Sequence, residues 1–82
     1  MKVKFSFSAI GLSLKENKTK DDRSFYQISI DQDGEAGVLP LSEEAYKLAS
    51  PTFKKYSPVN LTCEYNDQYK SLRVLSLSQG LK

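Results

Sequence analysis

The apolar residues of the N-terminal stretch VKFSFSAIGLSL change their step halfway along it. Val3, Phe5 and Phe7 stand at odd positions with polar residues between them, and this period of two is typical of a strand with one buried face. From Ile10 onwards the apolar residues stand at even positions. Because a one-residue slip turns every later side chain to the opposite face of a sheet, the strand must either end near Ala9 or absorb the slip in a bulge.

A second change of step occurs near the C-terminus. Leu72 and Val74 alternate, and the apolar series then continues at Leu75 and Leu77. Bulges give long strands the curvature that a small closed barrel needs, and a glycine such as Gly11 relieves the backbone at a bend. The two slips therefore favour a barrel with bent strands. The alternative is a sandwich in which the N-terminal stretch forms two separate strands.

Short segments separated by turn signals make up the rest of the chain. Besides the N-terminal strand, alternating apolar residues predict strands over residues 24–30, 36–41, 59–65 and 69–77. The N-cap hydroxyl of Ser42 and two glutamates in the first turn predict a short helix that ends before Pro51. Ala45, Leu48 and Ala49 share the apolar face of this helix.

The predicted order is three strands, one helix and two strands. The oligonucleotide/oligosaccharide-binding (OB) fold has this order, with its helix between the third and fourth strands. We therefore predict an all-β class with one short helix, as a five-stranded OB-fold-like small barrel with the helix between strands 3 and 4. With 82 residues, of which 39% are apolar and 27% charged, the chain has the length and composition of one globular domain, residues 1–82.

The residue inventory favours binding over catalysis. The chain contains one cysteine, Cys63, and no histidine, which excludes an internal disulfide and a zinc site and removes the commonest general base near neutral pH. The sequence has no glycine-rich phosphate loop, no metal-binding carboxylate pair and no serine-nucleophile elbow. We therefore expect a non-enzymatic protein without a metal or another cofactor.

The hydropathy and the net charge give less information about the cellular location and the binding partner of the protein. The sequence shows neither an apolar run long enough to span a bilayer nor a signal peptide, so we expect no membrane contact and a cytoplasmic location. The net charge of +2 is too small to name a partner by itself, because mixed solvated surfaces commonly carry such a value.

Clusters of aromatic and basic residues fall in or beside the predicted loops. If the apolar side of the second strand faces the core, Tyr26 points inward and Phe25 outward, and the two exchange roles if the register differs by one. Lys18, Lys20 and Arg23 lie just upstream. Basic grooves with aromatic platforms hold single-stranded nucleic acid without sequence choice, and each stacked base contributes roughly 1–3 kcal/mol.

Two further clusters have the same composition. Tyr69 and Lys70 stand at the tip of the last predicted hairpin, where little core is available to bury a ring. Phe53, Lys54, Lys55 and Tyr56 follow the predicted helix. We expect Tyr56 to pack against the helix, whereas Lys54 and Lys55 fit an ordinary solvated surface and a phosphate contact equally well.

Five motifs follow one another along most of the chain, namely MKVKF at the N-terminus, RSFYQISI, VLPL, KKYSPVNL and DQYKSLRVLSL. In their order and spacing they resemble the single-stranded DNA-binding, helix-destabilising proteins of filamentous bacteriophages, of the gene V type. The best match is DQYKSL, because members of that family place an aromatic residue after a short turn, and then Ser-Leu, before the closing strand.

This resemblance implies a five-stranded barrel, a homodimer in the host cytoplasm and cooperative, largely sequence-independent coating of phage or mobile-element single-stranded DNA during replication. It also implies that Phe25 or Tyr26, together with Tyr69, stacks on bases and that nearby cations neutralise phosphates. The candidate nucleic-acid-binding residues are Lys18, Lys20, Arg23, Phe25, Tyr26, Tyr69, Lys70 and Arg73. The residues do not choose between DNA and RNA.

A second function remains open, that of a small phage-type adaptor that uses the same barrel to bind a host protein. The modest net charge and the acidic residues Glu16, Asp21 and Asp22 among the basic ones support it. A continuous basic groove that holds Phe25 and Tyr69 would favour DNA, whereas a mixed surface with an apolar patch would favour a protein partner.

Overall fold

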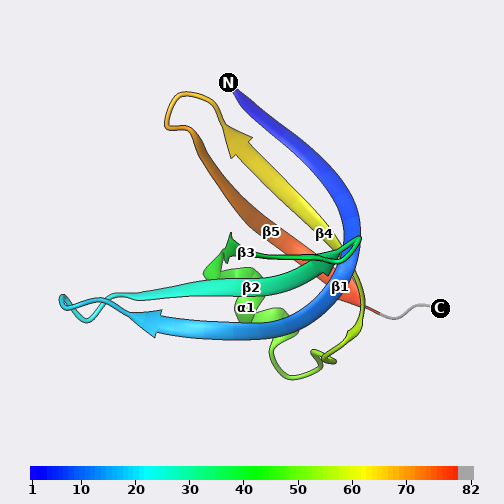
Figure 1. The fold of residues 1–82 in the computed structure, drawn as a ribbon. Helices are drawn as coiled ribbons and strands as arrows, with labels where there is room; N and C mark the ends of the chain where they lie inside the picture. Colours follow the sequence, from blue (N-terminus) through cyan, green and yellow to red (C-terminus); the bar gives the residue numbers. More distant parts are fainter. Residues whose placement is uncertain (80–82) are drawn as a thin grey trace.

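A single strand, β1 (Lys2–Lys18), takes part in both halves of the fold (Figure 1). In the computed structural model, which describes residues 1–79, the N-terminal half of β1 pairs with β4 (Ser57–Asn66) and its C-terminal half pairs with β2 (Ser24–Gln32). Both pairings are antiparallel. The strand therefore continues through the change of step, and the alternative of two separate strands in a sandwich is wrong.

The strands close into a ring in the order β1-β2-β3-β5-β4. β3 (Glu35–Leu41) follows β2 through the Asp33-Gly34 turn, α1 (Glu43–Ala49) lies between β3 and β4, and β5 (Ser71–Gln79) returns beside β4. This arrangement confirms the predicted class, a mostly β, five-stranded small barrel with one short helix between strands 3 and 4.

The first slip lies in a bulge at Leu12. Gly11 pairs with Ile30 of β2, whereas Ser13 pairs with Ser29, so that Leu12 is the extra residue. The core-facing side chains of β1 are therefore odd-numbered before the bulge and even-numbered after it. The apolar pattern predicted this change at Ile10, slightly before the bulge at Leu12. Ile10 is apolar but lies on the outer face of β1.

Gly11 has a packing role rather than the conformational role that we predicted. Among the described residues, the glycine with a positive φ is Gly34, at 86°. A Cβ atom at Gly11 would instead lie 2.9 Å from Cζ of Phe53. The missing side chain at Gly11 therefore lets the Phe53 ring approach the bend of β1 closely.

The second slip lies at Leu75, as predicted. Thr62 of β4 pairs with Ser76, whereas Cys63 pairs with Val74, which leaves Leu75 as the extra residue of β5. A bulge bends its strand and increases the local twist. β5 is therefore curved where it completes the ring.

One parallel pair, Leu41 with Val74, joins β3 to β5 and closes the ring. Pro40, the preceding residue of β3, has no N–H to donate to a neighbouring strand, and this agrees with its prediction as an edge or strand-end residue. Pro40 and Arg73, which precede the pair in the two strands, are both exposed.

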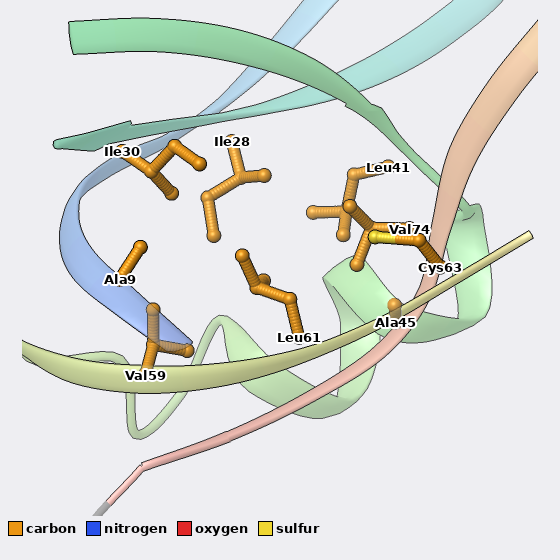
Figure 2. Packing of buried hydrophobic residues seen from close by; sticks show 9 residues of the cluster. All are labelled: Ala9, Ile28, Ile30, Leu41, Ala45, Val59, Leu61, Cys63 and Val74. Atoms are coloured by element: carbon orange, nitrogen blue, oxygen red, sulfur yellow. The ribbon is translucent and has the colours of Figure 1, made fainter. Parts of the chain in front are cut away.

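Residues from every strand and from the helix form the buried core inside the ring (Figure 2). They are Ala9, Ile28, Ile30, Leu41, Ala45, Val59, Leu61, Cys63 and Val74. Burial of an aliphatic side chain of the Val, Leu or Ile size contributes roughly 1.5–3 kcal/mol. Burial of the alternating apolar residues of the strands therefore stabilises the barrel.

The helix is capped as predicted but packs differently. The Ser42 Oγ accepts a hydrogen bond from the Ala45 N–H at 3.2 Å, and Ala45 is buried. Leu48, which we expected on the same apolar face, is 79% exposed. α1 has 7 residues, about two turns, and the ring of Tyr46, stacked on Tyr26, takes the place on the barrel that the pattern assigned to Leu48.

Within residues 1–79, α1 is too short to cross a membrane, and no other helix there is long and apolar enough to do so. The same residues contain no group of side chains that could hold a metal ion.

Candidate nucleic-acid interface

Phe25 and Tyr26 point to opposite faces of β2. Tyr26 pairs with Leu41 on the core side, and its ring stacks on Tyr46 at a centroid distance of 4.4 Å. Phe25 pairs with Asn17 of β1, and 44% of its surface is exposed. The alternation of β2 therefore leaves Phe25 as the ring that faces the outer surface.

A hollow of about 330 Å³ lies beside Phe25. Pro40 of β3, Arg73 of β5 and the N-cap residue Ser42 also line it. Tyr26 reaches the same hollow, but the helix holds its ring by stacking. The structure thus brings Phe25 and Arg73, two of the candidate residues from distant parts of the sequence, onto one surface.

A second hollow, of about 420 Å³, adjoins the first at Pro40 and Arg73. We call the two together the β3 groove, which is lined among others by Phe25, Pro40, Arg73, Lys2, Asn66 and Ser71. Asn66 ends β4 and Ser71 begins β5, so the far end of the groove lies at the base of the β4–β5 turn.

The charges along the β3 groove are mixed. Arg73 Nη2 lies 3.8 Å from Glu64 Oε1, and at the other end Glu43 Oε2 lies 2.7 Å from Lys47 Nζ. The hydrogen bond and the negative charge of Glu43 raise the pKa of Lys47 above its ordinary value. The Glu43–Lys47 pair is exposed on both sides and contributes little to stability, whereas the Glu64 side chain is only 12% exposed and lies beside the more exposed Arg73. The groove is therefore not a continuous basic channel.

The β1–β2 turn presents Lys18, Lys20 and Arg23 at the tip of one arm of the fold (Figure 1). The Thr19 N–H donates to the Arg23 carbonyl at 2.9 Å, and the Thr19 hydroxyl accepts from the Arg23 N–H at 3.3 Å. Asp22 adopts a φ of 61°, and its carboxylate lies 4.0 Å from Lys18 Nζ. Asp22 therefore has a structural role in the turn, and the three cations around it are exposed.

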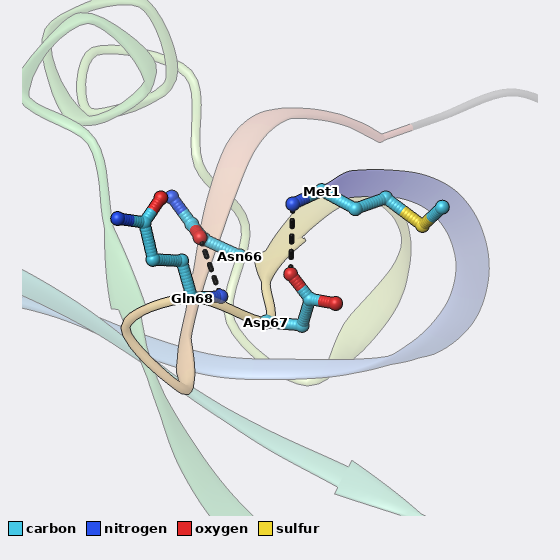
Figure 3. Close-up of polar contacts among 4 residues, drawn as sticks. All are labelled: Met1, Asn66, Asp67 and Gln68. Atoms are coloured by element: carbon cyan, nitrogen blue, oxygen red, sulfur yellow. Dashed lines mark hydrogen bonds and ion pairs between the residues drawn. The ribbon is translucent and has the colours of Figure 1, made fainter.

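The β4–β5 turn is tied to the N-terminus (Figure 3). The α-amino group of Met1 lies 2.8 Å from Asp67 Oδ1, and the Asp67 N–H donates to the Met1 carbonyl at 3.1 Å. Asn66 Oδ1 accepts from the Gln68 N–H at 3.0 Å, as in an Asx turn. These contacts hold the backbone of the turn, while the side chain of Tyr69 stays outside, with 72% of the residue exposed.

The candidate residues thus fall into three places. Phe25 and Arg73 share the β3 groove, the three cations of the β1–β2 turn lie at one tip, and Tyr69 and Lys70 lie at the other. β5 begins only at Ser71, two residues later than predicted, so both Tyr69 and Lys70 belong to the turn. The two turns form the ends of separate arms of the fold (Figure 1).

Three residues of the β3 groove were not predicted from the sequence, and Tyr56, outside the groove, was predicted in the wrong environment. Lys2, Asn66 and Ser71 lie side by side through the register of β1, β4 and β5, and only knowledge of that register could have joined them. Tyr56, which we expected to pack against the helix, is 75% exposed. In the same loop, the half-buried ring is that of Phe53.

Comparisons of the chain with protein-family models, with curated proteins and with solved structures give no match.

Proposed function

We propose that this protein is a non-enzymatic single-stranded DNA-binding protein. The observation that carries the proposal is the position of Phe25, an exposed ring on the outer face of a small closed barrel, in one hollow with Arg73. A ring and a cation side by side can stack on a base and bind the adjacent phosphate, whatever the base sequence. The two turns add Tyr69, Lys70 and the cations of the β1–β2 turn on either side of this hollow.

Binding of this kind destabilises secondary structure without a chemical step. The exposed ring needs an unstacked base, which a single strand offers and a duplex does not. A ligand that binds only one of two states shifts the equilibrium toward that state by mass action. In this proposal the protein coats phage or mobile-element DNA during replication, as a homodimer in the host cytoplasm, and these last features rest on the sequence resemblance alone.

A titration of fluorescently labelled oligothymidylate and of a duplex of equal length tests the proposal. We expect binding of the single strand, weaker binding of the duplex, and a log–log dependence of affinity on salt with a slope of several units, since each neutralised phosphate of a single strand contributes about −0.7. Absence of affinity for oligothymidylate at low salt, or an affinity that does not change with salt, would overturn it.

A protein-binding adaptor is the second candidate, and two observations favour it. The β3 groove carries both charges, with Glu43 and Glu64 facing the cations. Val3 and Phe5 continue the apolar face of β1 beyond the core and are exposed. An adaptor that recognises a protein needs no affinity for oligothymidylate, so the same titration distinguishes the two functions.

A further inference from the structure

The loop between α1 and β4, residues 50–56, is hydrogen-bonded to the barrel. The Lys54 N–H donates to Gln79 Oε1 at 2.7 Å, and Gln79 Nε2 donates to the Lys54 carbonyl at 2.8 Å. The Tyr56 N–H donates to the Gly11 carbonyl at 2.6 Å. Phe53 packs against the position where Gly11 lacks a Cβ atom. Hydrogen bonds of the loop backbone with the Gln79 side chain and the Gly11 carbonyl, together with the half-buried Phe53 ring, therefore place this 50–56 loop at the bend of β1.

The same contacts keep the Tyr56 side chain in solvent. Tyr56 has a φ of 62°, a left-handed conformation that residues with a Cβ atom rarely adopt. Such backbone persists where the surroundings impose it, and it occurs often at functional sites. The loop thus maintains an unfavourable conformation and still leaves 75% of the tyrosine exposed. Burial of the ring does not explain the arrangement.

The charge of the 50–56 loop is uniformly positive. Lys54 and Lys55 are both exposed, and the loop contains no acidic residue. Within residues 1–79 neither lysine takes part in an ion pair, in contrast to Arg73 and Lys47, which have carboxylate partners. The loop therefore presents an aromatic ring next to two uncompensated cations.

A polar surface leads from this loop toward the β3 groove along the outer face of β1, β4 and β5. Its two cross-strand rows are Ser8–Asn60–Ser78 and Ser6–Thr62–Ser76, and we call these six residues the β4 track. A hollow of about 280 Å³ lies over them and adjoins, at Ser78, another of about 250 Å³ that reaches Lys54. Hydroxyl and amide side chains of this kind hold the phosphate and sugar groups of nucleic acids.

The next row of the same face joins the β4 track to the β3 groove. It consists of Lys4, Glu64 and Arg73, aligned across β1, β4 and β5. Glu64 is the acidic residue of this row, and Arg73 lies close to it. An unbroken polar face thus extends from Arg73 to Ser78, and the loop lysines lie at its end.

We propose that the bound single strand passes from the β3 groove along the β4 track to the 50–56 loop, where Tyr56 stacks on a base and Lys54 and Lys55 bind phosphates. This inference rests on the proposed function and assigns the path of the ligand. β4 has 10 residues, and strands rise about 3.3 Å per residue, so the path crosses roughly 30 Å between the two ends of β4. At about 3.4 Å or more per nucleotide, a strand covers this distance with about nine nucleotides or fewer, which lies within the roughly 4–16 nucleotides that OB folds bind.

The experiment compares oligothymidylates of about 4 and about 16 nucleotides, the two ends of that range. The test variant is Lys54→Gln/Lys55→Gln/Tyr56→Asn, because asparagine tolerates the left-handed conformation of position 56. We expect it to bind the short strand as the wild type does, within about twofold, and the long strand at least about tenfold more weakly, since two phosphate contacts and one stacked base are lost. The salt slope for the long strand should fall by about 1.4.

The conservative variant Lys54→Arg/Lys55→Arg/Tyr56→Phe retains the charges and the ring and should bind both lengths as the wild type does. Thermal unfolding of both variants checks that the fold is intact. Equal losses for the short and the long strand, or no loss for either, would overturn the proposed path while the proposed function stands. If the wild type binds neither strand, the proposed function and the path both fail.

Discussion

The ring of Tyr26 stacks on the ring of Tyr46 with 4.4 Å between their centroids and an interplanar angle of 28°. This contact joins β2 to the helix and commits Tyr26 to the packing of the barrel. Phe25, the preceding residue, is thereby left as the aromatic side chain of β2 that can meet a ligand. Two adjacent rings, which the sequence alone treats as interchangeable, have separate roles.

Substitution of the two rings should affect different properties. Phe25→Ala should weaken binding of oligothymidylate by roughly 1–3 kcal/mol and change the free energy of unfolding by no more than about 0.5 kcal/mol, as is usual for exposed positions. Tyr26→Ala should lower the free energy of unfolding by at least about 1 kcal/mol, because it removes the stacked pair and its buried surface. Denaturant titration and fluorescence anisotropy measure the two quantities. Normal binding by Phe25→Ala would remove this ring from the site.

Tyr69 should contribute to binding and not to folding. The contacts that hold the β4–β5 turn involve Met1, Asp67 and the side chain of Asn66, so loss of the exposed Tyr69 ring leaves them in place. Tyr69→Ala should weaken binding of a single strand by roughly 1–3 kcal/mol. Tyr69→Phe is the control, since it retains the stacking surface, and equal affinity of the two variants would contradict the assignment.

Alanine at three glycines should have three different effects on stability. Gly11→Ala places a Cβ atom 2.9 Å from the Phe53 ring, and such overpacking costs about 1–3 kcal/mol. Gly34→Ala meets no described atom within 4 Å, but its φ of 86° is unfavourable for alanine by about 1–2 kcal/mol. At Gly37 an added Cβ atom meets no described atom within 4 Å, and φ is not positive. Gly37→Ala should therefore leave the free energy of unfolding nearly unchanged.

A second substitution separates the two mechanisms. If Gly11 is required for the close approach of Phe53, the cost of Gly11→Ala should shrink in a Phe53→Leu background, whereas the cost of Gly34→Ala should not change. Urea-induced unfolding of the single and double variants gives these free energies. Additive effects of Gly11→Ala and Phe53→Leu would show that the close contact does not limit the packing.

Cys63 should make stability depend on alkaline pH. Burial raises the pKa of the Cys63 thiol above its ordinary value, so the folded state keeps its proton at a pH where the unfolded state loses it. The stabilisation is therefore complete below the ordinary thiol pKa, about 8.5, and decreases as the pH rises above it. Cys63→Ala lacks this titration, so its difference in unfolding free energy from the wild type should narrow between pH 7 and pH 10. Parallel curves would contradict the prediction.

The contribution of the Ser42 N-cap to the free energy of unfolding should also be measurable by substitution. The Ser42 hydroxyl accepts from the Ala45 N–H and lies 3.4 Å from the Leu75 carbonyl, at the second bulge. Ser42→Ala should lower the free energy of unfolding by about 1 kcal/mol. Ser50→Ala, at the other end of the helix, is the control and should be nearly neutral. Equal effects of both substitutions would show that the cap makes no specific contribution.

Much of the barrel follows from local sequence patterns. The two changes of step predicted two bulges, and both exist, at Leu12 and Leu75. Period-two patterns located the strands, and the hydroxyl of Ser42 located the start of the helix. These predictions succeed because alternation and capping depend on neighbours along the chain.

The candidate site was less accessible from the sequence. Alternation predicted that Phe25 and Tyr26 lie on opposite faces, but it left open which ring is exposed. The proximity of Phe25 to Arg73 depends on the β3–β5 contact, which joins segments far apart in the chain. Tyr56 was predicted to pack against the helix and is exposed, because the loop backbone exchanges two hydrogen bonds with the Gln79 side chain and donates one to the Gly11 carbonyl.

The sequence by itself determined the class of fold and the bent strands, and it determined that Phe25 and Tyr26 lie on opposite faces of their strand, because each follows from side-chain periodicity over a few residues. The tertiary structure alone decided that Gly11 accommodates Phe53, that Tyr26 belongs to the helix contact, and that Phe25 and Arg73 share a surface. These relationships arise when the ring closes and brings distant strand ends together, and the one parallel pair that closes it leaves no local pattern in the sequence.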